Sequence, residues 1–307
     1  MAAMSERALI GWIRSRIGRR GGRIVVDSGD DAAVLRFGRR QILFKTDGVI
    51  DGVHFDSATA RPEEIGHKAV ARCLSDLAAM AGVPGFAVAA LMIPRNAREQ
   101  YVRRVIEGME RTASAFGAAI VGGDISSHPG RLAITVAMLG ETQGWSPVRR
   151  SGARLGDVFA VTGKLGGSIL GKHLRFVPRV REALELRRRF DLHAMIDISD
   201  GLLVDLDRLC RESGVGAVLE ESSIPISPAA RRLARRDRRS PLEHALGDGE
   251  DYELLFALPA DQSSRLERSG LGRVVGEAAA MEGIYLRRRD GRLEERTAEG
   301  WEHRWGR

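Results

Sequence analysis

The chain of 307 residues contains little cysteine and no long apolar run. Its two cysteines, Cys73 and Cys210, lie inside helical apolar patterns, which predicts reduced core thiols rather than a disulfide framework or a metal site. No apolar run approaches the roughly 20 residues that a membrane helix needs. Residues 1–20 lack the apolar core of a signal peptide. We therefore expect a cytoplasmic protein that does not cross a membrane.

Aromatic residues are also scarce, at 5% of the chain, which is few for a protein that stacks on bases. The formal net charge of +7 permits a nucleic-acid hypothesis, because clustered Lys and Arg neutralise phosphates. The arginines lie mostly in runs at residues 187–189, 231–239 and 287–289, and no nucleic-acid-binding motif surrounds them. We interpret these runs as solvated helix faces and loops, and nucleic-acid binding stays an alternative.

Hydrophobic residues make up 43% of the chain, enough for a substantial core and for two domains. Helical and strand patterns alternate along it. A connection rich in Gly, Pro and Ser at residues 142–152 predicts the boundary between an N-terminal domain, residues 1–145, and a C-terminal domain, residues 146–307.

Carboxylates gather in glycine-flanked loops at the ends of predicted strands. In Asp197-Ile-Ser-Asp-Gly-Leu202 an apolar strand ends in two acids, a hydroxyl and a glycine before a helical pattern begins. Two acids held so close repel each other unless a cation or hydrogen bonds compensate. The same arrangement recurs in Ser28-Gly-Asp-Asp31, Lys45-Thr-Asp47, Ser75-Asp76, Gly122-Gly-Asp124 and Gly247-Asp-Gly-Glu-Asp251.

Two of these acidic positions, and one histidine, each allow two interpretations. Asp76 lies at the margin of the apolar face of a helix predicted at residues 62–82, where it either pairs with Arg72 one turn away or holds a cation. A strand at residues 118–121 ends in Gly122-Gly-Asp124, either to let a ligand approach the backbone or to form a tight turn. His54 is predicted in a loop, as a surface residue or as a functional one.

The glycine-rich segment after the predicted strand 158–162 imitates a phosphate-binding loop. Residues 166–172 have the spacing of a P-loop, but His173 stands where a Ser or Thr should hold Mg²⁺. We therefore reject a P-loop here. A helical pattern follows, up to residue 190.

The number of carboxylates favours metal binding over acid and base catalysis. Glycoside hydrolysis needs only two carboxyl groups, whereas this chain has about eight in such loops. Carboxylates together with substrate phosphates are the usual ligands of Mg²⁺. The sequence therefore predicts several Mg²⁺ ions that carry a polyphosphate, and phosphoryl transfer as the reaction.

Seven motifs, in this order, resemble the thiamine-monophosphate kinase family, which shares its superfamily with aminoimidazole ribonucleotide synthetase, selenophosphate synthetase and a hydrogenase maturation factor. They extend from about Asp30 to Trp301. They are Gly29-Asp-Asp-Ala-Ala33, Thr46-Asp47 with His54-Phe55, Leu74-Ser-Asp-Leu-Ala-Ala-Met80, Gly122-Gly-Asp124, Arg150-Ser-Gly-Ala153 with Gly156-Asp157, Asp197-Ile-Ser-Asp-Gly-Leu202 and Gly249-Glu-Asp-Tyr-Glu-Leu254.

The resemblance implies two α/β domains of the aminoimidazole ribonucleotide synthetase type. The first would pair with its twin to form a homodimer, and the second would close over the nucleotide. ATP and thiamine monophosphate would give ADP and thiamine diphosphate with Mg²⁺. The implied metal ligands are Asp30, Thr46, Asp47, Asp76, Asp124, Asp197 and Asp200. The implied ATP contacts are Gly123, Asp124, Arg150 and Ser199, and the implied contacts to thiamine monophosphate are His54, Glu250 and Trp301.

The implied chemistry needs no dedicated base, because the accepting phosphate oxygen is already anionic near neutral pH. Mg²⁺ with Arg150 would screen the repulsion between two anions and align them, and Asp200 would act with Arg150 in catalysis. We therefore expect direct transfer without a phosphoenzyme. The alternatives are another enzyme of the superfamily with a different phosphate acceptor, and a non-catalytic protein that binds Mg²⁺ and nucleotide.

The chain departs from the family pattern in three places. Lys45 stands where relatives usually have Ser or Thr, so a hydroxyl contact to metal is lost and an ammonium for a phosphate is gained. Phe176 and Val177 replace part of the usual Leu-Arg-Pro run. Asp248 adds an acid to the loop that holds Glu250.

Overall fold

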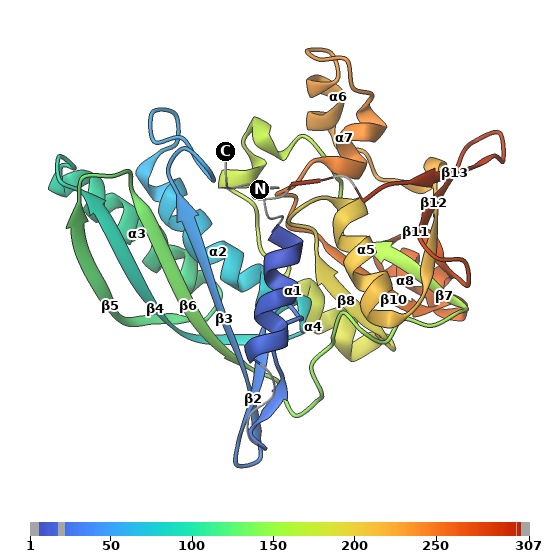
Figure 1. Cartoon of the computed structure of the whole chain (residues 1–307), viewed down its shortest axis with the longest axis horizontal. Coiled ribbons are helices and arrows are strands. Elements are labelled where there is room, and N and C mark those ends of the chain that lie inside the picture. The colour runs from blue at the N-terminus through green and yellow to red at the C-terminus, as the bar shows by residue number, and fades with distance from the viewer. Residues whose placement is uncertain (1–5, 18–21, 299, 302–307) are drawn as a thin grey trace.

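Each half of the chain builds one β-sheet, and the two sheets lie side by side in Figure 1. The computed structural model describes residues 6–17, 22–298 and 300–301. The first sheet has the strand order β1-β2-β3-β6-β4-β5, and the second has the order β13-β12-β9-β11-β7-β10-β8. Most pairs are antiparallel, while β4 with β5 and β9 with β12 are parallel. The fold is therefore a two-domain mixture of helices and sheets, as the sequence predicts.

In the part of the chain that the structure describes, helices cover only one face of the first sheet, so its strands alternate between buried and exposed side chains. In β4 the side chains of Ala87, Ala89 and Leu91 are buried, whereas Phe86 and Val88 are exposed. Figure 1 views this sheet from its open side, with α2 and α3 behind it. The elements of this half are α1(Glu6–Ile17), β1(Ile24–Val26), β2(Ala33–Phe37), β3(Arg40–Ile50), α2(Pro62–Ala79), β4(Val83–Pro94), α3(Glu99–Ala115), β5(Ala119–His128) and β6(Ala133–Glu141).

The second half carries longer connections that reach back toward α2. Its strands are β7(Asp157–Val161), β8(Ala194–Asp197), β9(Gly216–Glu220), β10(Leu254–Pro259), β11(Arg273–Ala279), β12(Ile284–Arg287) and β13(Leu293–Arg296). Its helices are α4(Val180–Arg189), α5(Leu202–Ser213), α6(Pro228–Leu233), α7(Pro241–Gly247) and α8(Ser263–Ser269). Short 3₁₀ turns are η1(Ser168–Leu170), η2(Lys172–Leu174), η3(Glu221–Ser223) and η4(Ala260–Gln262).

Two element predictions are wrong. The strand predicted at residues 118–121 continues as β5 to His128, so Gly122-Gly-Asp124 is part of a strand rather than a turn. A Cβ on Gly123 would lie 1.9 Å from the carbonyl oxygen of Ala89, so the glycine allows β5 to approach β4. The helix predicted up to residue 190 is broken into η1, η2 and α4, because glycines such as Gly167 and Gly171 adopt positive φ.

A continuous apolar core joins the two halves. Leu74 and Leu77 of α2 belong to the same buried cluster as Met195 of β8 and Phe256 of β10. Helix α2 thus lies between the two sheets, and both halves of the chain hold the side chains at its ends in place. Among the described residues, none of the helices combines the length and the apolar character needed to cross a bilayer.

Candidate active site

Helix α2 brings three charged side chains to the junction of the two halves. Lys68, Arg72 and Asp76 follow one another at intervals of four residues, so they lie along one face of the helix. Lys68 is fully buried and Asp76 is nearly so. Because the same face meets β8 and the loops of the second half, each of these charges needs a partner from another segment.

Three buried acids converge next to Asp76. Oxygen atoms of Asp31, Asp76 and Asp197 all lie within 4.8 Å of one another, and we call these three residues the carboxylate cluster. Burial raises the pKa of Asp76 well above its usual value, although the charge of Lys45 opposes this rise, and burial and then Asp31 raise the pKa of Asp197 to about 7. A set of crowded carboxylate oxygens fits a hard divalent cation such as Mg²⁺. The acids come from both halves of the chain, so the site exists only in the folded whole.

Arg150 and Ser75 hold two members of this cluster in place. The Arg150 guanidinium donates to Asp31 at 2.6 and 3.2 Å, and its backbone N–H donates to Asp30 at 3.1 Å. The Ser75 hydroxyl donates to Asp197 at 2.6 Å. The sequence indicated Asp30 as the ligand, whereas the structure points Asp31 into the cluster. Burial, and then Asp31, raise the pKa of the adjacent Asp30 to about 6.

Two cations lie against the acids of β3 and α2. The Lys45 ammonium lies 3.0 Å from Asp76 Oδ1 and 4.0 Å from Asp47 Oδ2. Arg72 Nη2 lies 3.5 Å from Asp47 Oδ1. The ion pair that the structure describes for Arg72 is therefore with Asp47, not with Asp76 as helix spacing allowed. Asp47 joins the site beside the carboxylate cluster.

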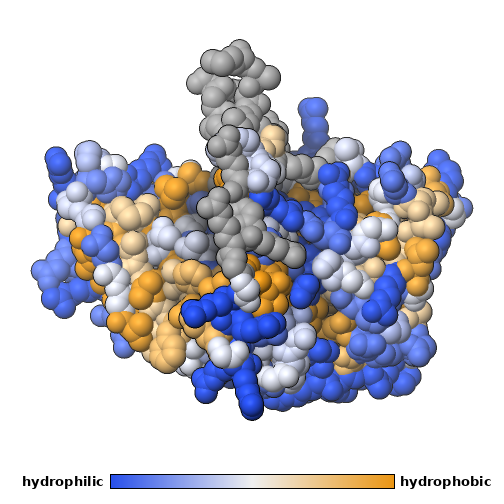
Figure 2. Space-filling model, turned by 60° about the horizontal axis from the view of Figure 1, so that its bottom comes forward, coloured by the Kyte–Doolittle hydropathy of each residue, from blue (hydrophilic) through white to orange (hydrophobic). Residues whose placement is uncertain are grey.

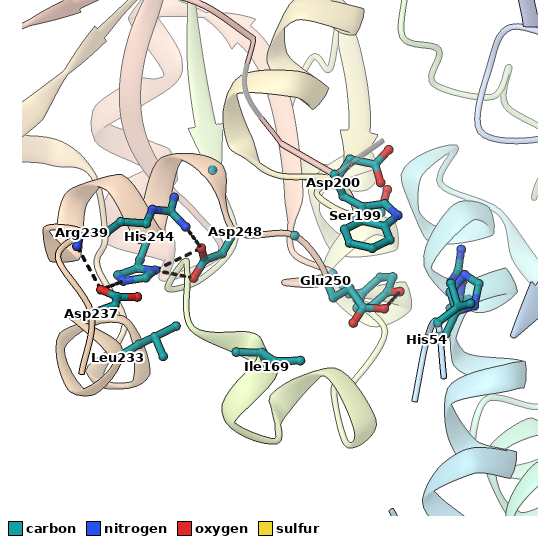
Figure 3. Close-up of a pocket in the computed structure, with 16 residues that line it drawn as sticks. His54, Ile169, Ser199, Asp200, Leu233, Asp237, Arg239, His244, Asp248 and Glu250 are labelled. Carbon is teal, nitrogen blue, oxygen red and sulfur yellow. Dashed lines mark hydrogen bonds and ion pairs between the residues drawn. The ribbon is translucent and has the colours of Figure 1, made fainter. Parts of the chain in front are cut away.

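A cavity of about 380 Å³ opens next to these charges, within the range of small-molecule sites. Figure 3 shows His54 on one side of it, facing Ser199, Asp200 and Glu250 from the other half. Trp301 also lines it, and the Trp301 backbone N–H donates to the carbonyl of Asp200 at 3.0 Å. Because Arg72 lines the cavity and also contacts Asp47, the cavity and the carboxylate cluster are neighbours.

Lys68 connects the two sides of this cavity, and the sequence did not single it out. Its ammonium lies 2.5 Å from the carbonyl oxygen of His54, 2.5 Å from Glu250 Oε1 and 3.0 Å from His173 Nδ1. Although burial raises the pKa of Glu250, the hydrogen bonds and charges of His173 and Lys68 outweigh it and lower that pKa to about 2. The available signal was the four-residue spacing from Lys68 to Arg72 and Asp76.

The loop after β8 is fixed by a buried acid and by an arginine. Asp205 accepts backbone hydrogen bonds from Ser199, Asp200 and Gly201 at 3.0 to 3.2 Å. Arg208 lies 2.5 Å from the carboxylate of Asp200, which faces the cavity and is not one of the three clustered acids. The carbonyl of Ser199 accepts from the backbone N–H of Glu250 at 2.7 Å, which ties the two loops together.

Thr46 and Asp124 lie apart from the carboxylate cluster. Neighbouring residues of a strand face opposite sides, so Thr46 and Asp47 diverge, and the Thr46 hydroxyl donates to the carbonyl of Val136 at 3.1 Å. Asp124 lies beside Gly123 on β5, three strands from Asp47 in the sheet, and accepts from the Ser126 hydroxyl at 3.0 Å. The roles implied for Thr46, Gly123 and Asp124 stay predictions.

Comparison with known proteins decides the family. The model of "AIR synthase related protein, N-terminal domain" matches residues 29–142, and that of its C-terminal domain matches residues 143–288. The chain is 38% identical to the thiamine-monophosphate kinase of Rhodopirellula baltica over 97% of each chain. It is 32% identical to that of Aquifex aeolicus over 90% of this chain and 92% of the relative. The chain belongs to the thiamine-monophosphate kinase family.

Solved structures of this family have the same fold. "AaThiL complexed with AMPPCP and TMP" superposes with a TM-score of 0.85 at 30% identity, covering 98% of this chain and 97% of that one. The thiamine-monophosphate kinase of Stenotrophomonas maltophilia gives a TM-score of 0.75 at 34% identity, covering 95% and 98%. The HypE–HypF complex, at 18% identity and a TM-score of 0.78 over 94% of this chain and 99% of that one, shares the fold.

Two departures from the kinase family pattern have a local structural explanation. Phe176 is buried and stacks on Tyr252 with ring centroids 3.7 Å apart, so it supports the loop that carries Glu250. Asp248 accepts from the backbone of Gly167 at 2.8 Å and lies 3.0 Å from His244 Nδ1. Figure 3 shows this acid at the end of the cavity opposite His54. Asp248 therefore fixes the far wall of the cavity.

Proposed function

We propose that this kinase-family chain transfers the γ-phosphoryl group of ATP to the phosphate of thiamine monophosphate, giving ADP and thiamine diphosphate. The observation that carries the proposal is the meeting of buried acids from both halves beside a cavity that His54, Glu250 and Trp301 line. A relative of the same fold has been solved with an ATP analogue and TMP together.

The acids that would hold Mg²⁺ are Asp31, Asp76 and Asp197 of the carboxylate cluster, with Asp30 and Asp47 beside them. Mg²⁺, when bound, supplies positive charge that screens phosphate groups from one another. Thr46, Asp124 and Asp200 are further ligands by family resemblance. Gly123, Asp124, Arg150 and Ser199 are proposed to contact ATP on the same ground.

The accepting group needs orientation more than activation. A phosphate oxygen of thiamine monophosphate is anionic near neutral pH, so no side chain has to remove a proton before it attacks. Arg72 lies between the cavity and Asp47, where a fixed guanidinium attracts a phosphate of either substrate. His54 and Glu250 are held by Lys68, and they are proposed to position the thiamine end. We therefore propose direct in-line transfer, with Arg150 and Asp200 contributing to catalysis.

The open face of the first sheet supports a homodimer. Three exposed side chains lie next to one another on neighbouring strands: Leu139 of β6 is opposite Phe44 of β3 and also opposite Phe86 of β4. Val88, two residues after Phe86 on β4, is exposed as well. Figure 2 shows apolar surface on the half of the molecule that carries this sheet. Contiguous exposed apolar surface of this kind marks interaction sites. We propose that a second copy of the chain covers it.

We propose a cytoplasmic location because the two thiols are free. Cys73 and Cys210 are both buried and unbonded to each other, as in proteins of reducing compartments. Burial raises the pKa of both thiols, which keeps them protonated and unreactive.

A coupled assay of ADP release with ATP, Mg²⁺ and thiamine monophosphate tests the reaction. ADP release should depend strictly on thiamine monophosphate, and thiamine diphosphate should appear in equal amount by chromatography. Tight nucleotide binding without turnover, or turnover with a different phosphate acceptor only, would contradict the proposal. A protein-bound phosphoryl group that is chemically competent would refute the direct transfer.

A further inference from the structure

Lys45 projects from β3 into the acids of the site. It alternates with Phe44 and Thr46, whose side chains are on the open face of the sheet, so its own side chain reaches the face covered by α2. There the ammonium lies 3.0 Å from Asp76 Oδ1 and 4.0 Å from Asp47 Oδ2. A lysine ammonium is charged near neutral pH. The side chain therefore brings a positive charge into this group of acids.

The other acids already have separate partners. Arg150 pairs with Asp31, the Ser75 hydroxyl donates to Asp197, and Arg72 approaches Asp47. Asp76 is the member of the carboxylate cluster that Lys45 neutralises. An ammonium that bridges Asp76 toward Asp47 occupies the space between two carboxylates, where a divalent ion would otherwise bind, and its charge repels such an ion.

We propose that Lys45 is a built-in monovalent cation that takes the place of one divalent ion between Asp47 and Asp76. This inference rests on the proposed function, because it concerns the Mg²⁺ ions of that reaction. Because the ammonium of Lys45 is part of the chain, it is always present in the site. The site therefore accepts one divalent ion fewer than the same acids would accept without the ammonium. Lys45 is thus a positioning residue that holds Asp76 in place before any metal arrives.

The number of bound divalent ions tests this directly. Equilibrium dialysis with Mn²⁺, in the presence of the non-hydrolysable ATP analogue AMPPCP, counts the ions without turnover and without thiamine monophosphate. We expect Lys45→Ser and Lys45→Met to bind one more Mn²⁺ per chain than the native protein. Lys45→Arg, which keeps the charge, should bind the native number.

Arg40→Ser is the matched control, because it removes one positive charge from the same strand at a side chain that is 78% exposed. It should bind the native number of ions. If Lys45→Ser gains an ion and Lys45→Met does not, a new serine ligand and not the lost ammonium creates the site, which overturns the proposal. An equal ion count in the native protein and all Lys45 variants also overturns it.

Thermal stability gives a second measurement in metal-free buffer. Lys45→Met leaves Asp76 without its cation, so its Tm should fall by about 5–10 °C relative to the native protein. Saturating Mg²⁺ should restore most of this loss, while it shifts the Tm of the native protein and of Arg40→Ser less. A Mg²⁺ shift of the same size in all of them would contradict the replacement of an ion by Lys45. If the ion count differs as expected but no turnover with thiamine monophosphate occurs, the proposed function fails and this inference stands.

Discussion

Lys68 shows how one residue can connect two sides of a binding cavity. Its ammonium lies against the carbonyl of His54 from one half and against Glu250 and His173 from the other. A buried lysine without partners would be strongly destabilising, so these contacts are needed for folding as well as for the geometry of the cavity. Lys68 therefore couples stability to the position of two proposed substrate contacts.

We expect Lys68→Met to lower the free energy of unfolding by about 3 kcal/mol, because Glu250 is left without its buried partner. The KM for thiamine monophosphate should rise more than the KM for ATP, since both displaced residues, His54 and Glu250, are proposed to contact thiamine monophosphate. Urea unfolding and steady-state kinetics measure the two effects. Lys164→Met, at an exposed lysine, is the control and should change stability by less than about 0.5 kcal/mol. Native stability and an unchanged KM in Lys68→Met would show that only the apolar stem of Lys68 matters.

At the scale of elements, helices α2 and α3 cross at two glycines. A Cβ on Gly108 would lie 2.3 Å from the carbonyl oxygen of Glu63, and one on Gly66 would lie 2.0 Å from that of Val105. The helices are thus packed backbone to backbone. This close contact sets the position of α2, and with it the positions of Lys68, Arg72 and Asp76.

Gly108→Ala should lower the free energy of unfolding by about 2 kcal/mol, because the added methyl group forces the two helices apart. Gly11→Ala on α1 is the matched control, since nothing in the described ranges of the chain lies within 4 Å of a Cβ at that helical position. It should raise stability slightly, by up to about 1 kcal/mol, through helix propensity. Urea unfolding at one pH measures both. Equal effects of the two substitutions would contradict the close crossing.

The contribution of His67, on helix α2, to the stability of the fold depends on pH. Its ring contacts Thr112 Oγ1 of α3 at 2.9 Å and the carbonyl of Phe176 at 2.8 Å. Burial lowers the pKa of His67 below its ordinary value of 6.5, since the charged ring is disfavoured there. The unfolded chain then binds a proton more readily than the folded one, so this contribution to stability is full above pH 6.5 and is lost as the pH falls below it.

The native protein should therefore lose more unfolding free energy than His67→Gln when the pH is lowered from 7.5 to 5.5. Denaturant unfolding at several pH values in this window measures the difference between the two slopes. The glutamine variant should be less stable at pH 7.5, but its own slope should lack the histidine contribution. Parallel slopes would mean that His67 titrates alike in the folded and unfolded states.

At the scale of the whole molecule, the apolar face of the first sheet predicts the assembly state. Phe86 is 58% exposed, and it lies beside Leu139 in the middle of the sheet. We expect Phe86→Lys to convert a dimer into a monomer with an intact fold, as measured by sedimentation velocity and circular dichroism. Phe37→Lys, at an equally exposed phenylalanine near the β2–β3 turn, should leave the dimer intact. A monomeric native protein would refute the homodimer.

The sequence predicts the family, the two-domain fold and most elements, because glycine-flanked acids and strand or helix periods are local patterns. It cannot decide which of Asp30 and Asp31 points into the site, because the side chains of adjacent loop residues have no fixed relative orientation. The contacts of Lys68 with His173 and Glu250 are also out of reach, because they join segments more than 100 residues apart. The divergence of Thr46 from Asp47, in contrast, follows from strand alternation and was predictable.

The apolar core shared by α2, β8 and β10 has a consequence for how the chain can be divided. Cutting the polypeptide between the two sheets would expose Leu74, Leu77, Met195 and Phe256 to water on both fragments. Neither fragment should then melt as an independent unit, and calorimetry of the intact chain should show a single cooperative transition. Replacing one half of the chain by that of a distant relative would require that the core residues on both sides of this contact between the halves be replaced together.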